Sequence, residues 1–472
     1  MDQQIVDAVS RPTVHVWEED PGIHPSSRTP IGITARDPGE SPLACKISER
    51  EPNSDDTRRH AIRYWTASDS LARTKDWLAQ TSISLSWHPV MKGVLPVRIY
   101  AGEGLGGYYH RSSEKLGLEF HRTPSGIFSC ESPDIVCHEV GHAILDGLRP
   151  ELIETQTLEV KAFHESFGDI CSMLSSLTLP SFCSAVIHET HGVINQSSRL
   201  SRMAEQLSSE VRRRWPGLAE PSAMRDMANE FYYIDPLELP IRSPAHSLCN
   251  EKHSFSRIFS AAFLDFLAGV FSRSSKSVED LQQAANVTAR ILCQAASQTP
   301  VSNRYWSDMA ANMLLVDMRD FGGEYESPLR ESFSGRGVLL PGDLAGVSRN
   351  NLKGFTGAYI PDGPGRDTSD PAHSLSIDGE KYGVIGSFEV GVPRESPSIV
   401  SPRGSDPVAD LRESKILAAC FVDSLFMHHQ VEVDKGLTIS NSPMPAIAVG
   451  STVYEIFKPD TGPARLRQVA FA

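Results

Sequence analysis

The chain has 472 residues, of which 40% are hydrophobic and 22% are charged, the composition of a soluble globular protein with roughly two to four structural units. Its formal net charge of −14 excludes nucleic acid as a general partner, because binding phosphate groups requires a surplus of Lys and Arg. The longest apolar stretch, residues 258–271, contains Asp265 and is too short to span a bilayer, so no membrane partner is expected.

The first residues and the cysteines predict an intracellular protein. The opening segment MDQQIVDAVSRPTVHV has no basic region followed by an apolar run, so it does not match a secretory signal. The eight cysteines are scattered and none forms a CxxC pair, which favours free thiols in a reducing compartment over disulfides. We therefore expect a cytoplasmic protein, with secretion by a non-classical route as the alternative.

Residues 1–58 are rich in Pro, Ser, Asp and Arg, a composition that cannot bury a core by itself, and they are expected to form a flexible arm. From Arg59 onward apolar residues recur at helical spacing, and the segment VLPVRIYAG then predicts a strand. The glycine-rich segment AGEGLGGYYH leads into a second strand, KLGLEFHRT. Because no strand–helix–strand unit surrounds these glycines, a hairpin turn or an edge bulge is favoured over a phosphate-binding loop.

A helix is expected to follow the second strand. Ser132 supplies a capping hydroxyl, Pro133 suits the first helical position, and Asp134 lies in the first turn. Gly147 and Pro150 should end this helix.

The rest of the chain changes from a helical to a β-type pattern. An apolar stripe predicts a second helix over about residues 159–174, and residues 199–335 are mostly helical, with a capping box at Ser277 and Asp280. After residue 335, glycine, proline and short β-type runs predict a separate β-rich module, residues 336–472, with one helix.

The segment DIVCHEVGHAILD (residues 134–146) places His138 and His142 four residues apart. On a helix they lie one turn apart on one face, so both rings can reach a single metal ion. Glu139 is rotated off that axis, close enough to touch a metal-bound water without binding the metal. Imidazole and carboxylate ligands suit zinc, and a catalytic zinc site has three protein ligands and one water. One zinc ion is therefore the expected cofactor.

The third ligand is expected on the next helix. The segment KAFHESFGDI offers Glu165, and Asp169 follows four residues later on the same face. Glu165 would complete a His₂Glu site, and Asp169 would accept the far N–H of a histidine ligand and so fix its tautomer. An isolated HExxH pattern also arises by chance, but the capped helix, the two preceding strands and the Glu-x-x-x-Asp helix favour metal binding.

These motifs resemble those of the thermolysin-type gluzincins, which have HExxH, a Glu on the next helix and an Asp four residues later. Asp134 and Asp146 also match acids that flank the motif in that family. The segment KHSFSRIFSAAFLDF is similar to the stretch of thermolysin and fungalysin relatives in which a His opens a long buried helix and hydrogen-bonds the oxyanion. His253 is the matching residue, with His246 as the alternative. The resemblance covers roughly residues 60–335.

The resemblance implies an α+β fold with two thermolysin-like lobes. Residues 59–158 would form an N-terminal lobe with edge strands and the HExxH helix, and residues 159–335 a helical lobe with the Glu ligand; the β-rich module would be an addition. It implies a zinc metallopeptidase that cleaves a peptide or protein substrate in the manner of an endopeptidase. Glu139 would be the base and His253 would stabilise the oxyanion. The strand at Val97–Ala101 and the glycine-rich segment after it would hold an extended peptide by edge pairing.

The chain departs from the family pattern at several positions. The stretch in which the family has its tyrosine proton donor contains no Tyr, so that role is empty or is filled from elsewhere, for instance by Tyr232 or Tyr233. The arginine that polarises the substrate carbonyl corresponds to Arg202 or Arg199, and spacing favours Arg202 as a catalytic residue. His164 stands beside the glutamate ligand, where the family often has Asn, and is expected to give a supporting hydrogen bond.

Calcium is not expected at the thermolysin-type site, because residues 170–187 contain no acidic residue and hard cations need several oxygen ligands. His428 and His429 are interpreted as structural or surface residues. Cys45 in the N-terminal arm is a minor alternative ligand for zinc.

Two other functions remain open at this point. One is a zinc enzyme on the same scaffold that acts on a non-peptide or biosynthetic amide. The other is a non-catalytic binding protein that keeps the metal for structure, against which Glu139 argues, because a structural site has no use for an unligated carboxylate there.

Overall fold

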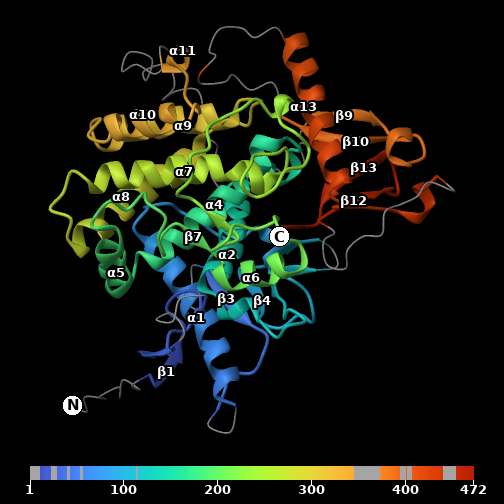
Figure 1. Cartoon of the computed structure of the whole chain (residues 1–472). Helices are drawn as coiled ribbons and strands as arrows, with labels where there is room; N and C mark the ends of the chain where they lie inside the picture. Colours follow the sequence, from blue (N-terminus) through green and yellow to red (C-terminus); the bar gives the residue numbers. More distant parts are fainter. Residues whose placement is uncertain are drawn as a thin grey trace, which may run out of the picture.

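Two five-stranded sheets, two two-stranded sheets and a stack of helices make up the described part of the protein (Figure 1). The computed structural model describes residues 11–22, 29–39, 43–53, 57–112, 115–344, 373–393, 400, 407–439 and 453–471. This mixture of helices and sheets confirms the expected α+β class at a coarse level.

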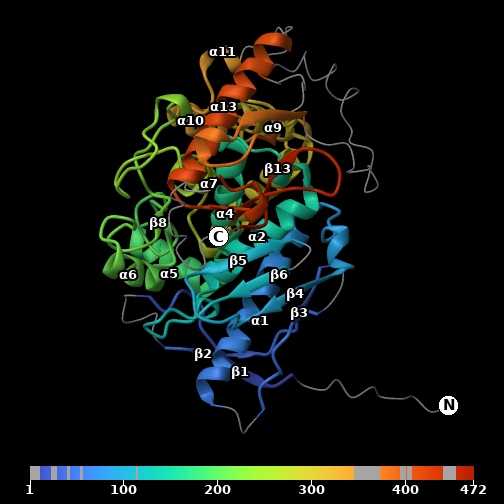
Figure 2. The same cartoon turned by 90° about the vertical axis from the view of Figure 1, so that its right-hand side faces the viewer.

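The first sheet takes strands from both ends of the chain. Its strands are β3 (Ala44–Ile47), β4 (Val94–Arg98), β5 (Gly107–Arg111), β6 (Leu116–Phe120) and β14 (Ala470–Phe471). They lie in the order β14-β5-β6-β4-β3, and Figure 2 looks onto the run from β5 to β3. β5 and β6 are antiparallel, β4 is parallel to both β6 and β3, and β14 is antiparallel to β5. β5 therefore lies between β6 and a strand from the other end of the chain.

The described part of residues 1–58 does not form the flexible arm that its composition suggested. β3 pairs with β4 in the first sheet, and β1 (Thr13–Val16) pairs with β2 (Ile31–Thr34) and packs on helix α1 (Arg58–Ala79). The Asp20 carboxylate is buried and accepts hydrogen bonds from the Ser132 hydroxyl and the Gln206 N–H. The expectation is wrong for these residues. Each strand has only four residues, so the polar residues around the strands determine the average composition of the segment.

Helices form the centre of the molecule and its upper part in Figure 1. Their bounds are α2 Pro133–Leu148, α3 Glu151–Glu154, α4 Leu158–Ser176, α5 Pro180–Thr190, α6 Glu205–Arg214, α7 Lys252–Phe271, α8 Val278–Gln298, α9 Tyr305–Asp320, α10 Glu326–Gly335 and α11 Pro341–Leu344. Every residue of α4 is buried, and α2 and α7 both pack against it. The core therefore centres on α4.

The predicted start of α2 is confirmed. The Ser132 hydroxyl accepts a hydrogen bond from the Ile135 N–H, and Pro133 occupies the first turn together with Asp134. The helix ends at Leu148, close to the expected stop. The capping box of α8 is also present as predicted.

Helix α7 is longer than the apolar run that the sequence singled out. Its length and composition would allow a membrane crossing, yet 78% of its apolar window is buried within the protein, as in the core helix of a soluble fold. Asn195 donates a hydrogen bond to Asp265 in this helix, and the Arg336 guanidinium lies 2.7 Å from the same carboxylate.

The second sheet packs against α13 (Pro407–Met427) through β10. It lies to the right of the helices in Figure 1. Its strands, β9 (His373–Asp378), β10 (Ser387–Val392), β11 (Val431–Val433), β12 (Tyr454–Phe457) and β13 (Ala464–Gln468), run in the order β11-β12-β13-β10-β9. This region is β-rich as predicted, but it is not separate. The Gln156 N–H donates to the Gly391 carbonyl, and the Lys161 ammonium donates to Gln468 over 2.7 Å.

Candidate metal centre

Two glycines allow α2 and α4 to pack closely enough to share a site. A Cβ added at Gly141 of α2 would lie 2.9 Å from the Cα of Gly168 in α4. A Cβ at Gly168 would lie 2.7 Å from ring atoms of His138. Larger side chains at these positions would push the helices apart, so the glycines set the distance between the histidine helix and the glutamate helix.

His138, His142 and Glu165 converge at this contact, as the sequence predicted. Each offers one ligand atom, and the three atoms lie within 4.8 Å of one another. Oε2 of Glu165 is 3.4 Å from Nε2 of His138 and 3.8 Å from Nε2 of His142. All three side chains are buried. We call them the ligand group.

The chemistry of the ligand group fits a metal ion, and the donor set is one that zinc accepts. Neither ring nitrogen of His142 has a hydrogen-bond partner among the described residues, although buried polar atoms are nearly always paired. Burial lowers the pKa of His142 well below its ordinary value, which keeps the imidazole neutral, the form that binds metal. Two imidazoles and a carboxylate are a common catalytic zinc set.

Asp169 lies beside His138, where the sequence placed a carboxylate that would orient this histidine. Its Oδ1 lies 3.0 Å from Nδ1 of His138, the nitrogen that faces away from the ligand group. The guanidinium of Arg225 holds the same carboxylate through both oxygens, with distances of 2.6 and 3.1 Å. Burial alone would raise the pKa of Asp169, but the charge of Arg225 lowers it below the ordinary value. The carboxylate therefore stays ionised beside the histidine.

Glu139 lies beside the ligand group without belonging to it. Its side chain packs against β5, where a Cβ at Gly107 would come within 2.8 Å of its Cγ. Oε2 of Glu139 has no hydrogen-bond partner among the described residues, and only 3% of the residue is exposed. Burial raises the pKa of this carboxyl to about 7. A carboxylate of this kind can accept a proton near neutral pH.

Asp146 fixes β5 next to the histidine helix. It is one of the two flanking acids noted in the sequence, and it lies at the end of α2. The Tyr109 hydroxyl donates to it over 2.5 Å and the Arg111 guanidinium over 2.6 Å. Both partners are residues of β5. The strand is therefore bonded to the helix that carries two of the ligands.

His253 enters the site from the first turn of α7, and His246 does not. Nε2 of His253 lies 3.1 Å from Oε2 of Glu165, and its Nδ1 lies 2.7 Å from Oε1 of Glu251. His253 thus touches a ligand side chain directly, closer than a residue across the cleft would be. His246 is exposed, on the chain segment before α7.

Lys252 is a site residue that the sequence analysis did not identify. Its buried ammonium donates to Oε1 of Glu165 over 2.7 Å. Burial would raise the pKa of Glu165, but the charges of His253 and Lys252 lower it well below the ordinary value. Lys252 directly precedes His253 in the sequence. That position is the one sequence feature that could have indicated its place in the site.

Arg202 does not lie where the family resemblance placed it. Its guanidinium binds Glu205 over 2.6 Å and lies 3.4 Å from Glu189, and Arg199 also pairs with Glu189. Both arginines line a cavity apart from the ligand group. Arg225 is the arginine that reaches the centre, from β8 (Arg225–Asp226), which pairs with β7 (Arg202–Met203). The spacing of the family motif pointed to Arg202 in β7, but the arginine that reaches the centre lies in the paired strand β8.

Neither tyrosine named as a proton donor faces the ligand group. Tyr232 is 61% exposed, and the Tyr233 hydroxyl donates to Glu159 over 2.6 Å. The expected supporting hydrogen bond of His164 is also absent among the described residues, because neither of its ring nitrogens has a partner. Its ring instead lies 4.5 Å from the ring of Phe471.

Two further histidines and a cysteine lie away from the centre. His428 lies 2.9 Å from the Ile241 carbonyl through Nε2, which confirms a structural role, and His429 ends the same helical region in a left-handed conformation. Cys45 is buried in β3, where its thiol donates to the Leu43 carbonyl. It is not part of the metal-binding group.

The strand expected to hold a peptide is not at the edge of the sheet. β4 lies between β3 and β6, so Val97 has neighbours on both sides. The glycine-rich segment, residues 101–110, follows β4 and includes Gly107 to His110 of β5, and its Gly102 and Gly106 adopt positive φ values of 114° and 69°. β5 is the strand closest to Glu139, and its outer side pairs with β14.

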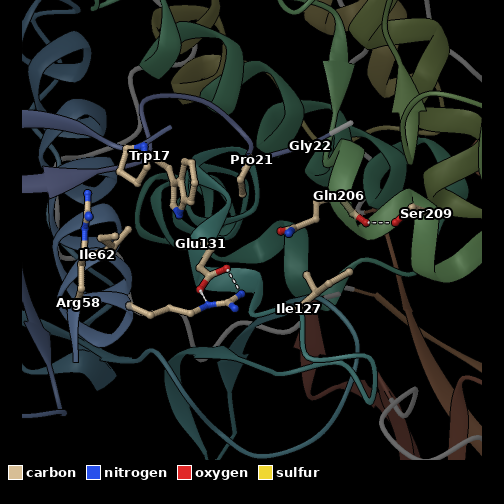
Figure 3. A pocket seen from close by; sticks show the side chains of 11 residues that line it. Trp17, Pro21, Gly22, Arg58, Ile62, Ile127, Glu131, Gln206 and Ser209 are labelled. Carbon is tan, nitrogen blue, oxygen red and sulfur yellow. Dashed lines mark hydrogen bonds and ion pairs between the residues drawn. The ribbon is translucent and has the colours of Figure 1, made fainter. Parts of the chain in front are cut away.

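A cavity of about 950 Å³ lies elsewhere, between the β1 region, α1 and α6. Trp17, Ile62 and Ile127 line it, and the Arg59–Glu131 ion pair forms part of its wall (Figure 3). Its described lining contains no member of the ligand group. This large cavity and the candidate metal centre are therefore different places in the protein.

Replacing Gly168 with Ala is expected to weaken metal binding, because the added Cβ would displace the ring of His138. Partners that orient a metal-bound histidine are worth about 10–100-fold in affinity, and we expect a loss of that size in a competitive zinc titration. Gly269→Ala is the control, since its Cβ would meet Pro328 at 2.8 Å in the same protein, away from the centre. Equal zinc affinity in the two variants would contradict this account.

No protein-family model matches the chain, and a search of curated proteins finds no similar sequence. Any function must therefore be argued from the site itself.

Proposed function

We propose that the protein is a zinc-dependent peptidase of the gluzincin type that hydrolyses internal peptide bonds. The observation that carries the proposal is the convergence of the ligand group with an unligated, buried Glu139 beside it. A purely structural metal site would have no use for that carboxylate. A thermolysin-like arrangement is part of the proposal, with the first sheet and α2 on one side of the centre and α4 and α7 on the other.

The ligand group would hold the zinc ion. Zinc bound by these side chains supplies Lewis acidity, which lowers the pKa of water and polarises a carbonyl oxygen. Asp169 and Arg225 keep the ring of His138 in the orientation that presents Nε2 to the ligand group. Because Arg225 holds both oxygens of Asp169, the carboxylate that faces His138 is itself fixed.

Glu139 acts as the proton carrier in this proposal. It takes a proton from the attacking water as the water oxygen bonds to the carbonyl carbon. It then gives that proton to the amide nitrogen as the carbon–nitrogen bond breaks, so the amine leaves neutral. Its pKa of about 7, raised by burial, suits a group that must both accept and release a proton near neutral pH.

His253 stabilises the charge that develops on the carbonyl oxygen. Glu251 lies 2.7 Å from its Nδ1, which leaves Nε2 to face the centre. Burial would lower the pKa of His253, but Glu165 and Glu251 raise it to about 9. Nε2 lies 3.1 Å from Oε2 of Glu165, so its N–H would be placed to bind an oxyanion that forms beside that ligand.

Replacement of Glu165 tests whether the ligand group holds zinc. Glu165→Gln should lower the zinc content from about one ion per chain to a small fraction, because a catalytic site depends on three protein ligands. Elemental analysis and peptide hydrolysis are both measured, and both should fall. Glu159→Gln is the control, since Glu159 is a buried acid on the same helix that binds Tyr233 and the Trp306 N–H. Full zinc in the Glu165 variant would remove this residue from the site.

A further inference from the structure

The outer side of β5 is already covered by a strand of the same chain. Ala470 pairs with His110 and Phe471 pairs with Tyr109, in antiparallel register. The other side of β5 pairs with β6. Without β14, β5 would be an edge strand with unpaired N–H and C=O groups, and such an edge can bind an extended peptide as an added strand.

The side chain of Phe471 packs against His142, one member of the ligand group. Its ring lies 4.7 Å from the ring of His142, nearly parallel at 29°, and 4.5 Å from the ring of His164. The ammonium of Lys252 lies 5.9 Å from the centre of the same ring. Only 2% of Phe471 is exposed. The aromatic ring therefore occupies the space next to this face of His142.

Polar contacts hold the segment that leads into β14. The Lys161 ammonium donates to Oε1 of Gln468 over 2.7 Å, and the Gln468 amide donates to the Ala470 carbonyl over 3.0 Å. The Val469 N–H donates to the Val453 carbonyl over 2.9 Å. These bonds connect β14 to α4 and to the second sheet. β14 itself is only two residues long, so its contact with β5 is small enough to open without unfolding either sheet.

We propose that residues 469–471 are a built-in ligand of the peptide-binding edge, and that they keep the site closed until they leave it. The inference rests on the proposed function, because it takes β5 as the strand that binds substrate. A substrate strand cannot pair with Tyr109 and His110 while β14 does so. Binding of substrate and binding of β14 therefore exclude one another. The preferred external ligand has the same character: an extended segment with an aromatic side chain placed against His142.

Phe471→Ala in the full chain tests this competition. When an open state is about 0.1–10% populated, full opening raises kcat/KM by roughly 10- to 1000-fold, and we expect a rise in that range. The second readout is independent of catalysis. A fluorescent peptide with the sequence of residues 465–471, RLRQVAF, should bind the variant more tightly than the wild type by the same factor, as measured by anisotropy. Phe457→Ala is the control, because Phe457 lies in the second sheet against Arg467.

The outcomes separate the inference from the proposed function. Peptide binding that rises without any hydrolysis in either protein would support the competition and overturn the peptidase. Hydrolysis that is equal in wild type, Phe471→Ala and Phe457→Ala, with unchanged peptide binding, would overturn the competition and leave the peptidase standing. If Phe471→Ala unfolds at a lower temperature than the control, Phe471→Leu replaces it, and a smaller rise in both readouts is expected. No rise with a folded Leu variant would also overturn the competition.

Discussion

Glu139→Gln is expected to keep the zinc and to lower peptide hydrolysis by about 10²–10⁴-fold, the usual contribution of a general base. The amide has nearly the same shape as the carboxylate, and Glu139 is not one of the three ligands, so the metal should stay. The amide cannot accept the proton of the attacking water, so the chemical step should fail. Zinc content and kcat on a fluorogenic peptide are measured on the same sample.

Glu131→Gln is the matched control for this substitution. Glu131 is also a buried acid near the start of α2, but it pairs with Arg59 at the cavity of Figure 3. It should retain both zinc and hydrolysis. Loss of zinc in the Glu139 variant would make Glu139 a ligand, and undiminished hydrolysis would remove it as the base.

His253→Ala is expected to lower kcat by about 10²–10³-fold, the effect of removing one oxyanion donor. The interaction grows as charge develops on the carbonyl oxygen, so it belongs to differential binding of the transition state. KM should change little, because the ground state carries no such charge. Steady-state kinetics with a peptide substrate separate the two constants.

The substitution of His246 decides whether the right histidine has been chosen. His246 is exposed and His253 faces Glu165, so His246→Ala should have normal kinetics. Because His253 also contacts a ligand side chain, zinc content must be measured in parallel. If kcat falls in proportion to a loss of zinc, His253 acts by holding the ligand Glu165. If His246→Ala loses activity and His253→Ala does not, His246 is the oxyanion donor.

Local signals in the sequence located the metal ligands. The cap at Ser132 and the four-residue spacing of His138 and His142 depend only on helix geometry, and the helix forms as expected. Glu165 and Asp169 lie on the next helix with the same spacing, so one interface brings both pairs together.

Residues that depend on long loops could not be found in this way. Arg225 reaches Asp169 because β8 pairs with β7, and no local pattern marks that pairing. Selection by spacing from the family pattern chose Arg202 instead. Tyr233 was named only as one possible proton donor from elsewhere in the chain, and its hydroxyl donates to Glu159 instead.

The largest difference concerns the two ends of the chain. β3 joins the first sheet from the polar N-terminal segment, and β14 joins it from the other end. In the pairing of β14 with β5, strands that are hundreds of residues apart in the sequence come together. Composition and periodicity describe only local segments and do not indicate which strands pair. Peptide binding was therefore expected at Val97–Ala101 and the glycine-rich segment, of which only the last residues reach β5, and the contact of Phe471 with His142 was missed.

Cleavage of a peptide library tests the central claim most directly. Zinc-loaded wild type and Phe471→Ala are each compared with the same protein carrying Glu139→Gln, and new peptide ends are identified by mass spectrometry. The account predicts new ends with Phe471→Ala, fewer with the wild type, and none above background with either Glu139 variant. Peptides that stay intact with zinc-loaded Phe471→Ala, or that are cut equally with and without Glu139, would contradict it.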